Sequence, residues 1–304
     1  MLAFPLGVVT AWAWVGDSKS AGASAAGTGA RVTVAAASPV SQHAGEQSGG
    51  NAHPTLQLQP DPSLLSRPLG AQALGLGVRR VVLDPGHGGD NLGTASANGL
   101  LEKDLTLDLA KRVRELLVTQ GVDAVLTRTR DDTLSLKERA AVANGRRGDI
   151  FVSIHLNSVR PSSLQVVETY YLGPGDRPEH DQLAAKENEH SGYSLADMRA
   201  LLDGIYADAR RTESKRLAQS VQQSVVRRLR SIDPRIKDRG VKMAPFIVLV
   251  ATEMPAILAE VACLSNPDEG KRLRTDAYRQ TIAEALAAGI VTFGRAAAPR
   301  PPAS

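Results

Sequence analysis

Residues 81–90 read VVLDPGHGGD, a β-branched run that leads straight into a turn of proline, glycines and one histidine. Val81 and Val82 predict a buried strand. Residues that follow a strand in an α/β fold lie at the sheet edge where such folds place their active sites. His87 and its neighbouring glycines are therefore compatible with three roles: a phosphate-binding loop, a plain turn, or a loop that presents a metal ligand.

Phosphate binding is the role that the spacing disfavours. A dinucleotide loop needs the pattern G-x-G-x-x-G running directly into a helix, and a P-loop needs Gly-Lys-Ser/Thr at its end. Residues 86–93 supply the glycines, but the next expected helix begins only near Glu102, no spaced acidic residue follows for a ribose, and the P-loop ending is absent.

Outward from this stretch, strand and helix patterns alternate through residues 78–294. Such alternation, with several strands apolar on both faces, predicts one three-layer α/β domain whose mostly parallel or mixed central sheet is flanked by helices. Ser135 followed three residues later by Glu138 is a capping-box signature that starts one of the helices. Strands are expected at 78–84, 122–128, 149–156, 164–172, 247–250 and 255–261, and helices at 102–121, 135–146, 214–230, 265–274 and 276–294.

Composition narrows the class of protein. The 304 residues are 42% hydrophobic, enough for a sizeable core, and the net charge of +4 is too small to argue for a nucleic-acid partner. Basic runs interleaved with aromatic residues, as nucleic-acid stacking requires, are also missing. The single cysteine, Cys263, excludes an intrachain disulfide and a cysteine-based zinc cluster.

The N-terminal region indicates export rather than membrane insertion. Residues 2–15 are apolar but shorter than the about 20 residues that span a bilayer, so we interpret them as the core of a secretory signal, although no basic residue precedes them. Residues 16–76 are rich in Ala, Ser, Gly, Gln and Pro. We therefore expect residues 1–77 to be a signal segment plus a disordered linker, and 295–304 to be a disordered tail.

Residues 174–213 form a long insertion between an expected strand and the next expected helix. It contains nine acidic and five basic residues, a net charge of −4. Insertions of this length in a compact domain are usually functional or disordered. The periodic piece LADMRALLDGIY, residues 195–206, predicts a helix within it.

Two histidines and two glutamates stand out among the candidate site residues. Of six histidines, only His87 and His155 follow expected core strands, while Glu102 starts a helix and Glu260 ends an apolar strand. Taken singly, each has an ordinary interpretation as a turn residue, a hydrogen-bonded core histidine or an anion at a helix N-terminus. A carboxylate behind an apolar strand is costly unless it is paired or liganded, and catalytic zinc commonly takes two His and one Glu. Together they indicate a metal site.

Five motifs in fixed order carry a resemblance to a known family. They are VVLDPGHGGDNLGTASANGLLEKDLTLDLAKRV, VLTRTRDDTLSLKERAAVAN, DIFVSIHLNS, DRGVKMAPFIVL and PAILAEVACLSNPDE. The chain resembles the zinc-dependent N-acetylmuramoyl-L-alanine amidases of the amidase type 3 family, which cut bacterial peptidoglycan. The resemblance covers nearly all of residues 78–294 and implies a zinc amidase or carboxypeptidase-like fold.

The resemblance implies a role for each matching residue. His87, Glu102 and His155 are then the ligands of Zn²⁺, and Glu260 is the catalytic base that moves a proton from water to the leaving L-alanine nitrogen. Asp84 and Asn157 match motif positions with supporting roles. The one departure is Cys263, which stands where many relatives carry phenylalanine. The implied substrate is peptidoglycan, the place is the periplasm, and the purpose is wall remodelling during daughter-cell separation.

The cell-separation branch of that family implies a switch in the insertion. In those relatives an extra helical segment covers the zinc cleft until a LytM-type activator displaces it. We therefore expect Glu187, or else Glu189, to occupy the open zinc position at rest; a solvated surface helix is the alternative. Two other functions stay open: a degenerate wall-binding regulator, and a zinc carboxypeptidase that would use arginines such as Arg128 or Arg239 to hold a terminal carboxylate.

Overall fold

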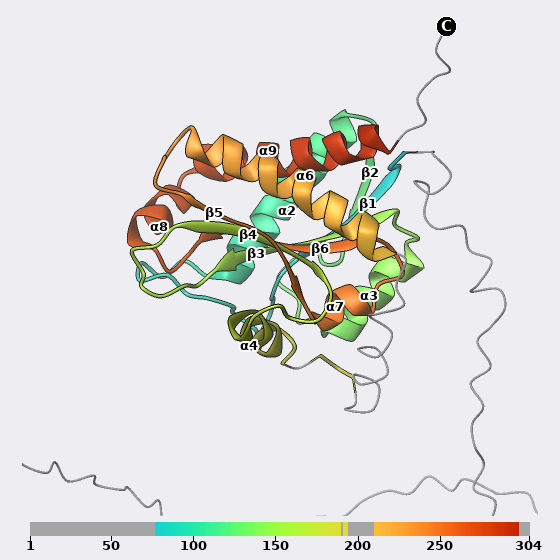
Figure 1. Cartoon of the computed structure of the whole chain (residues 1–304), viewed down its shortest axis with the longest axis horizontal. Coiled ribbons are helices and arrows are strands. Elements are labelled where there is room, and N and C mark those ends of the chain that lie inside the picture. The colour runs from blue at the N-terminus through green and yellow to red at the C-terminus, as the bar shows by residue number, and fades with distance from the viewer. Residues whose placement is uncertain (1–76, 190, 194–209, 298–304) are drawn as a thin grey trace, which may run out of the picture. The chain divides into compact units, whose positions relative to one another are not determined.

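The computed structural model describes residues 77–189, 191–193 and 210–297, and these contain a six-stranded mixed sheet (Figure 1). The strand order is β2-β1-β3-β6-β4-β5, and only β4 and β6 pair antiparallel among these neighbours. The strands are β1 (Arg80–Pro85), β2 (Asp123–Leu126), β3 (Ile150–Asn157), β4 (Val166–Leu172), β5 (Lys237–Ala244) and β6 (Ala256–Cys263).

Helices cover both faces of this sheet, which confirms the three-layer α/β prediction. Figure 1 shows α2, α6 and α9 on one face and α3, α4 and α7 on the other. The helices are α2 (Glu102–Thr119), α3 (Leu136–Gly145), α4 (Pro178–Glu187), α6 (Arg210–Arg230), α7 (Ile247–Val250), α8 (Pro267–Leu273) and α9 (Asp276–Ala296). Ser135 and Glu138 form the expected capping box at the start of α3.

The period-2 alternation of the strands divides the core in two. On β1, Val81 and Leu83 pack with the layer of α2, α6 and α9, while Val82 packs with the layer of α3 and α7. Strands β3, β4 and β6 alternate in the same way. Strands with apolar residues on both faces are what parallel sheets require.

The second face of the sheet becomes polar toward the carboxyl ends of the central strands. In sequence, Phe151 on β3 is followed at two-residue steps by Ser153, His155 and Asn157, all buried. Strand β6 carries Glu260 on this face, since Glu260 pairs with His155 in register. The alternation therefore gathers the chemistry-bearing side chains on one face, beneath α4.

One expected element near this face was wrong, and one strand was missed. Residues 247–250 form the short helix α7 instead of a strand, and all four side chains are buried. A short apolar run has no periodicity that separates a strand from a buried helical turn. The edge strand β5 was not predicted, because its first half, Lys237 to Arg239, is exposed and charged.

The insertion contributes α4, which lies against the polar face of the sheet (Figure 1). The helix expected at residues 195–206 lies outside the residues that the structure describes, as do the expected signal segment and linker up to residue 76. Helix α9 continues to Ala296, two residues beyond the expected end of the domain at residue 294. In the described ranges, no helix is both long and apolar enough to cross a membrane.

Candidate metal centre

Three of the predicted site residues meet at one point. Oε1 of Glu102 lies 3.1 Å from Nε2 of His87 and 3.3 Å from Nδ1 of His155. His87 comes from the loop after β1, His155 from β3, and Glu102 from the first residue of α2, where the helix dipole favours a negative charge. Their side chains are nearly inaccessible to solvent.

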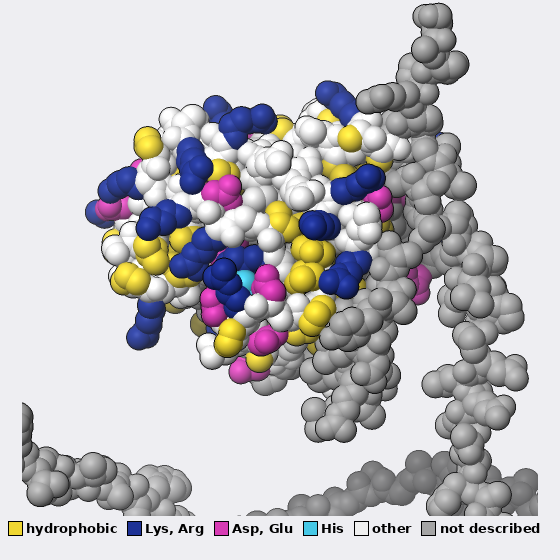
Figure 2. All heavy atoms as spheres, in the orientation of Figure 1, with side chains coloured by type: hydrophobic (Ala, Val, Ile, Leu, Met, Phe, Trp, Pro, Cys, Tyr) yellow, Lys and Arg dark blue, Asp and Glu magenta, His cyan; other side chains and the backbone are white. Residues whose placement is uncertain are grey.

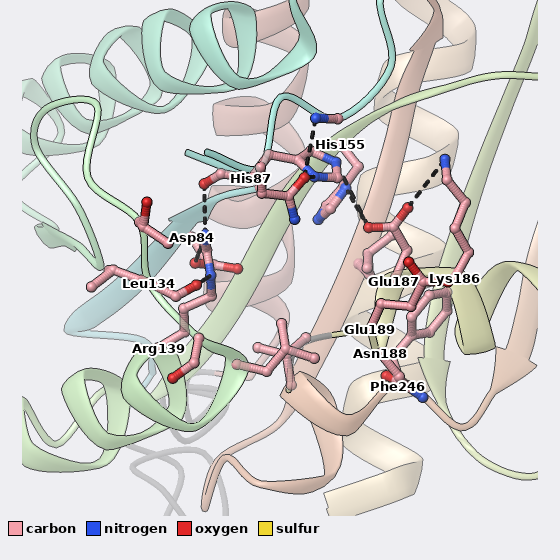
Figure 3. Close-up of a pocket in the computed structure, with 18 of the residues that line it drawn as sticks. Asp84, His87, Leu134, Arg139, His155, Lys186, Glu187, Asn188, Glu189 and Phe246 are labelled. Carbon is pink, nitrogen blue, oxygen red and sulfur yellow. Dashed lines mark hydrogen bonds and ion pairs between the residues drawn. The ribbon is translucent and has the colours of Figure 1, made fainter. Parts of the chain in front are cut away.

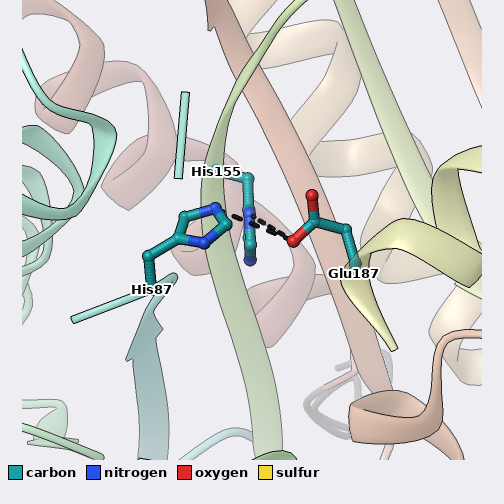
Figure 4. A group of neighbouring side chains, drawn as sticks. All are labelled: His87, His155 and Glu187. Atoms are coloured by element: carbon teal, nitrogen blue, oxygen red, sulfur yellow. Dashed lines mark ion pairs between the residues drawn. The ribbon is translucent and has the colours of Figure 1, made fainter. Parts of the chain in front are cut away.

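A fourth donor comes from the last residue of α4 (Figure 4). Oε2 of Glu187 lies 3.7 Å from both Nε2 of His87 and Nδ1 of His155. His87, His155 and Glu187 each offer one ligand atom, and these atoms lie within 4.8 Å of one another. Glu189 lines the same cavity but is exposed, and no ion pair joins it to either histidine in the part of the chain described.

The arrangement of these atoms fits a small tetrahedral cation. Nε2 of His87 and Nδ1 of His155 are buried and have no hydrogen-bond partner, which is costly without a further ligand. Zinc bonds of 2.0–2.1 Å in a tetrahedron place the donor atoms about 3.3 Å apart. The separations of 3.1, 3.3 and 3.7 Å between the facing nitrogens and oxygens bracket that value.

Hydrogen bonds behind the cluster fix the orientation of the donors. Nδ1 of His87 lies 3.0 Å from Oδ1 of Asn91, so Nε2 is left to face the cluster. Glu102 accepts the backbone N–H of Leu156 at Oε1 and that of Thr94 at Oε2. Contacts of this kind set the tautomer and direction of metal ligands. Asn91 and Thr94 were not singled out from sequence, since neither residue type marks this role.

The charges of the cluster depend on one another. Burial lowers the pKa of His87, but the close contact and negative charge of Glu102, together with the charge of Glu187, outweigh burial and leave that pKa raised. Burial likewise raises the pKa of Glu102, yet its contacts with His155 and His87 hold it well below its usual range. Glu102 is therefore a carboxylate, the form that binds a cation.

Glu260 lies beside the cluster with one oxygen unsatisfied. It is 2% exposed, and its Oε2 has no hydrogen-bond partner. Burial raises the pKa of Glu260 well above its usual range, and the neighbouring charges of Glu102, Glu187 and Glu168 add to that effect. A carboxyl group with a raised pKa accepts and holds a proton more readily than an exposed one, which suits acid–base chemistry.

A buried ion pair supports the histidine loop from below. Asp84 accepts hydrogen bonds from Arg139, Thr127 and Ser153, and Arg139 also donates to the backbone oxygens of Pro85 and His87. Burial raises the pKa of Asp84, but Arg139 and the hydrogen bonds prevail and hold it below its usual value. Asp84 thus anchors, through Arg139, the loop that carries His87.

The backbone around His87 leaves little room for change. His87 has a φ of +59°, a left-handed conformation that is uncommon outside glycine and is often retained at functional sites. A Cβ on Gly86 would stand 2.5 Å from Cε1 and Nε2 of the His155 ring. The glycine at position 86 therefore makes space for a ligand histidine.

Gly86→Ala is expected to weaken zinc binding by about tenfold or more, the scale seen when the groups that support a ligand are disturbed. The new methyl group would overlap the His155 ring, so the ring would have to leave its present position beside Glu102. Zinc affinity is measured by competition with a chromophoric chelator. Gly145→Ala is the matched control, because its Cβ would meet no atom within 4 Å. Equal zinc affinity in the two variants would contradict this packing argument.

A cavity of about 630 Å³ opens in front of the cluster (Figure 3). His87 and His155 line one side, Glu187 and Asn188 close another, and Phe246 contributes an apolar wall. Asn188 holds the end of α4 in place, since its side chain accepts from the N–H of Ile247 and donates to the oxygen of Pro245.

The two arginines considered for a carboxypeptidase lie in different settings. Arg128 is buried, and it donates to the backbone oxygens of Pro85, Gly86, Lys103 and Arg130. Its donors are thus used to hold the loops of the site. Arg239 is partly exposed and lines a second cavity, along the first part of α4.

Asn157 and Cys263 occupy neighbouring positions on β3 and β6. Asn157 donates from Nδ2 to Oε1 of Glu168, which holds that carboxylate in place. Cys263 is buried, and burial raises the pKa of its thiol to about 11, so the thiol is inert at neutral pH.

Comparison with known proteins places this geometry in a family. The family model described as N-acetylmuramoyl-L-alanine amidase matches residues 81–292. The N-acetylmuramoyl-L-alanine amidase AmiA of Escherichia coli K12 is 31% identical over 222 residues, covering 71% of this chain and 76% of AmiA.

Solved structures agree with the sequence match. The amidase AmiC2 of Nostoc punctiforme superposes with a TM-score of 0.53 at 32% identity, covering 71% of this chain and 96% of AmiC2. The CwlD amidase of Clostridioides difficile was solved in complex with the GerS lipoprotein. It superposes with a TM-score of 0.54 at 25% identity, covering 71% of this chain and 98% of CwlD. The chain therefore belongs to the amidase type 3 family of N-acetylmuramoyl-L-alanine amidases.

Proposed function

We propose that this protein is a zinc-dependent peptidoglycan hydrolase that cleaves the amide bond between the lactyl group of N-acetylmuramic acid and the L-alanine of the stem peptide. The observation that carries the proposal is the meeting of two unpartnered histidine nitrogens with a buried glutamate oxygen, next to a second glutamate of raised pKa. Membership of the amidase family supplies the reaction.

His87, Glu102 and His155 would hold the zinc ion. When bound, zinc lowers the pKa of water toward neutrality and polarises a carbonyl oxygen. Glu102 keeps a negative charge on the cluster, while Asn91, Thr94 and Leu156 hold the donors in place. The Asp84–Arg139 pair fixes the backbone of the His87 loop against movement during the reaction.

Glu260 is the group that moves the proton. It takes a proton from the water that attacks the lactyl carbonyl and delivers it to the nitrogen of the departing L-alanine. The buried setting of Glu260 makes the protonated form stable enough to persist between these two transfers. Its free Oε2 is available for both.

Glu187 is proposed to inhibit the enzyme at rest. Its Oε2 faces both histidine nitrogens at 3.7 Å, in the position where a fourth ligand would bind. Glu189 is exposed, so the geometry favours Glu187 of the two candidates. Withdrawal of Glu187 from the two histidines is then the activating step, and a LytM-type protein is the proposed activator. The complex of CwlD with the GerS lipoprotein supports the idea that amidases of this family act with partner proteins.

Export to the periplasm and a part in daughter-cell separation complete the proposal. They rest on the apolar segment at residues 2–15 and on the kinship with AmiA.

Digestion of purified sacculi tests the function. The zinc-loaded chain is expected to release wall material, chelation to stop the release, and added zinc to restore it. Release that continues after the metal has been removed would contradict a zinc-dependent reaction.

A further inference from the structure

A second cavity, of about 840 Å³, lies along the first part of α4, whereas the metal cluster lies at the end of that helix, and this cavity plays no part in the chemistry above. Its floor is formed by Asn157, Glu168 and Tyr170 of the sheet and by Arg239 and Lys242 of β5, while α4 contributes His180. Figure 2 shows basic side chains gathered above α4, next to acidic side chains and a histidine.

The floor of this cavity carries an excess of positive charge. Glu168 is 3% exposed, and its Oε2 pairs with Nζ of Lys242 and lies 3.7 Å from Nη1 of Arg239. One carboxylate thus faces two cations. Arg160 and Arg177 add two cations to the lining, and Asp176 and Glu179 add two carboxylates, so the cavity has four cations against three carboxylates.

Arg239 lies at a bulge in β5. Val167 pairs with Asp238 but Glu168 pairs with Gly240, so Arg239 is an extra residue in β5. Gly240 has a φ of +76°, which glycine adopts without strain. Bulges redirect side chains and are common beside active sites. Because Asp238 pairs with Val167, the alternation of β5 places the next residue, Arg239, on the same face as Glu168.

The guanidinium of Arg239 has donors to spare. Within the described ranges it has the one ion pair at 3.7 Å and makes no hydrogen bond, although a guanidinium offers five N–H donors in a geometry that matches a carboxylate. His180 supplies an independent sign of a ligand: its Nε2 is buried in the cavity wall with no partner, while Nδ1 contacts Asp176.

The distance of the cavity from Glu260 determines which part of a substrate the cavity could bind. Glu168 and Glu260 pair directly across β4 and β6, and β5 is the next strand beyond β4. Two inter-strand steps of about 4.8 Å place β5 about 10 Å from Glu260, the length of about three extended residues. An anionic group on the substrate two or three residues from the cleaved amide would reach Arg239.

We propose that Arg239, with Lys242 held by Glu168, binds a free carboxylate of the stem peptide. This rests on the proposed amidase function and extends it to substrate recognition. The lactyl carboxyl of muramic acid is consumed in the amide bond, so the free carboxylates of such a substrate belong to its peptide. The peptide therefore runs from Glu260 across β4 to β5, and the glycan lies on the His87 side, in the cavity of about 630 Å³.

The test uses two forms of one peptide, L-alanyl-γ-D-glutamyl-lysine amide, whose C-terminus is blocked in both forms and whose second residue carries either a free α-carboxylate or a carboxamide. Binding to the zinc-loaded full chain is measured by calorimetry. Arg239 is 36% exposed with α4 in place, so the cavity admits a ligand without movement of the helix. The acid form is expected to bind about tenfold more tightly, as a charge-assisted pair at a partly exposed site provides.

Arg239→Gln is expected to abolish this preference, and Arg239→Lys to restore part of it. Arg228→Gln is the control, because Arg228 lies on α6 and pairs with Glu284 away from both cavities. This variant is expected to retain the preference for the acid form. Equal affinity for acid and amide, binding of neither, or a preference that survives in Arg239→Gln overturns the proposal.

The muramoyl derivatives of the same two peptides separate this proposal from the amidase function. A wild-type chain that hydrolyses both equally, without preference in binding, is an amidase lacking the carboxylate site. A chain that binds the acid form preferentially but hydrolyses neither has the site and lacks the proposed reaction.

Discussion

Glu260→Gln is expected to lower amidase activity by about a thousandfold while leaving zinc content and folding unchanged. General acid–base groups contribute roughly 10²–10⁴ in rate. Glutamine keeps the shape of the side chain but cannot accept the proton of water. Removing a buried carboxyl that carries an unsatisfied oxygen also relieves a desolvation cost, so we expect no loss of thermal stability.

The measurement is the rate of dye release from labelled sacculi, with metal content determined on the same samples. Glu284→Gln is the matched control, because Glu284 lies partly exposed on α9 and its contacts are with Arg228 and Gln280, away from both cavities. Activity within a few-fold of wild type in Glu260→Gln would reject Glu260 as the proton carrier. Lost zinc together with lost activity would assign Glu260 to the metal site instead.

Glu187→Ala is expected to produce the second large effect, an increase in amidase activity rather than a loss. Without the carboxylate that faces His87 and His155, basal activity is expected to rise by on the order of tenfold, the scale of typical regulatory couplings. The helix itself should stay docked, since Asn188 and the buried Ala184 still anchor it.

Glu189→Ala serves as the control, since Glu189 is exposed and, in the described part of the chain, pairs with neither histidine. It removes the same charge from the same segment, so a general electrostatic effect of the insertion would raise both variants equally. Unchanged activity in Glu187→Ala, with the fold intact, would show that Glu187 does not restrain the enzyme.

The strands that carry the histidines were predictable because buried parallel strands have apolar residues on both faces. Residues 81–85 and 150–157 are of this kind, and the residues that follow or end them are fixed in space by the sheet. Glu260 could be singled out for a related reason, since a carboxylate at the end of an apolar strand is costly to bury unless it is paired, liganded or protonated.

Other features depended on geometry that a single sequence does not contain. Glu187 and Glu189 lie in the same acidic segment, and only the position at which α4 ends brings one of them to the histidines. Arg239 lies near Glu168 because β5 pairs with β4 in the register that puts Asp238 beside Val167, and a single sequence does not state that pairing. The edge strand β5 itself has no apolar run to mark it.

Identifying the bond that the protein cleaves tests the central claim most directly. Sacculi are digested to completion with the zinc-loaded chain, and the soluble and insoluble products are analysed by mass spectrometry. The proposed function predicts free stem peptides that begin with an unblocked L-alanine, and glycan strands whose muramic acid carries a free lactyl carboxyl. Peptides still attached to muramic acid, with cuts only between amino acids or between sugars, would contradict it.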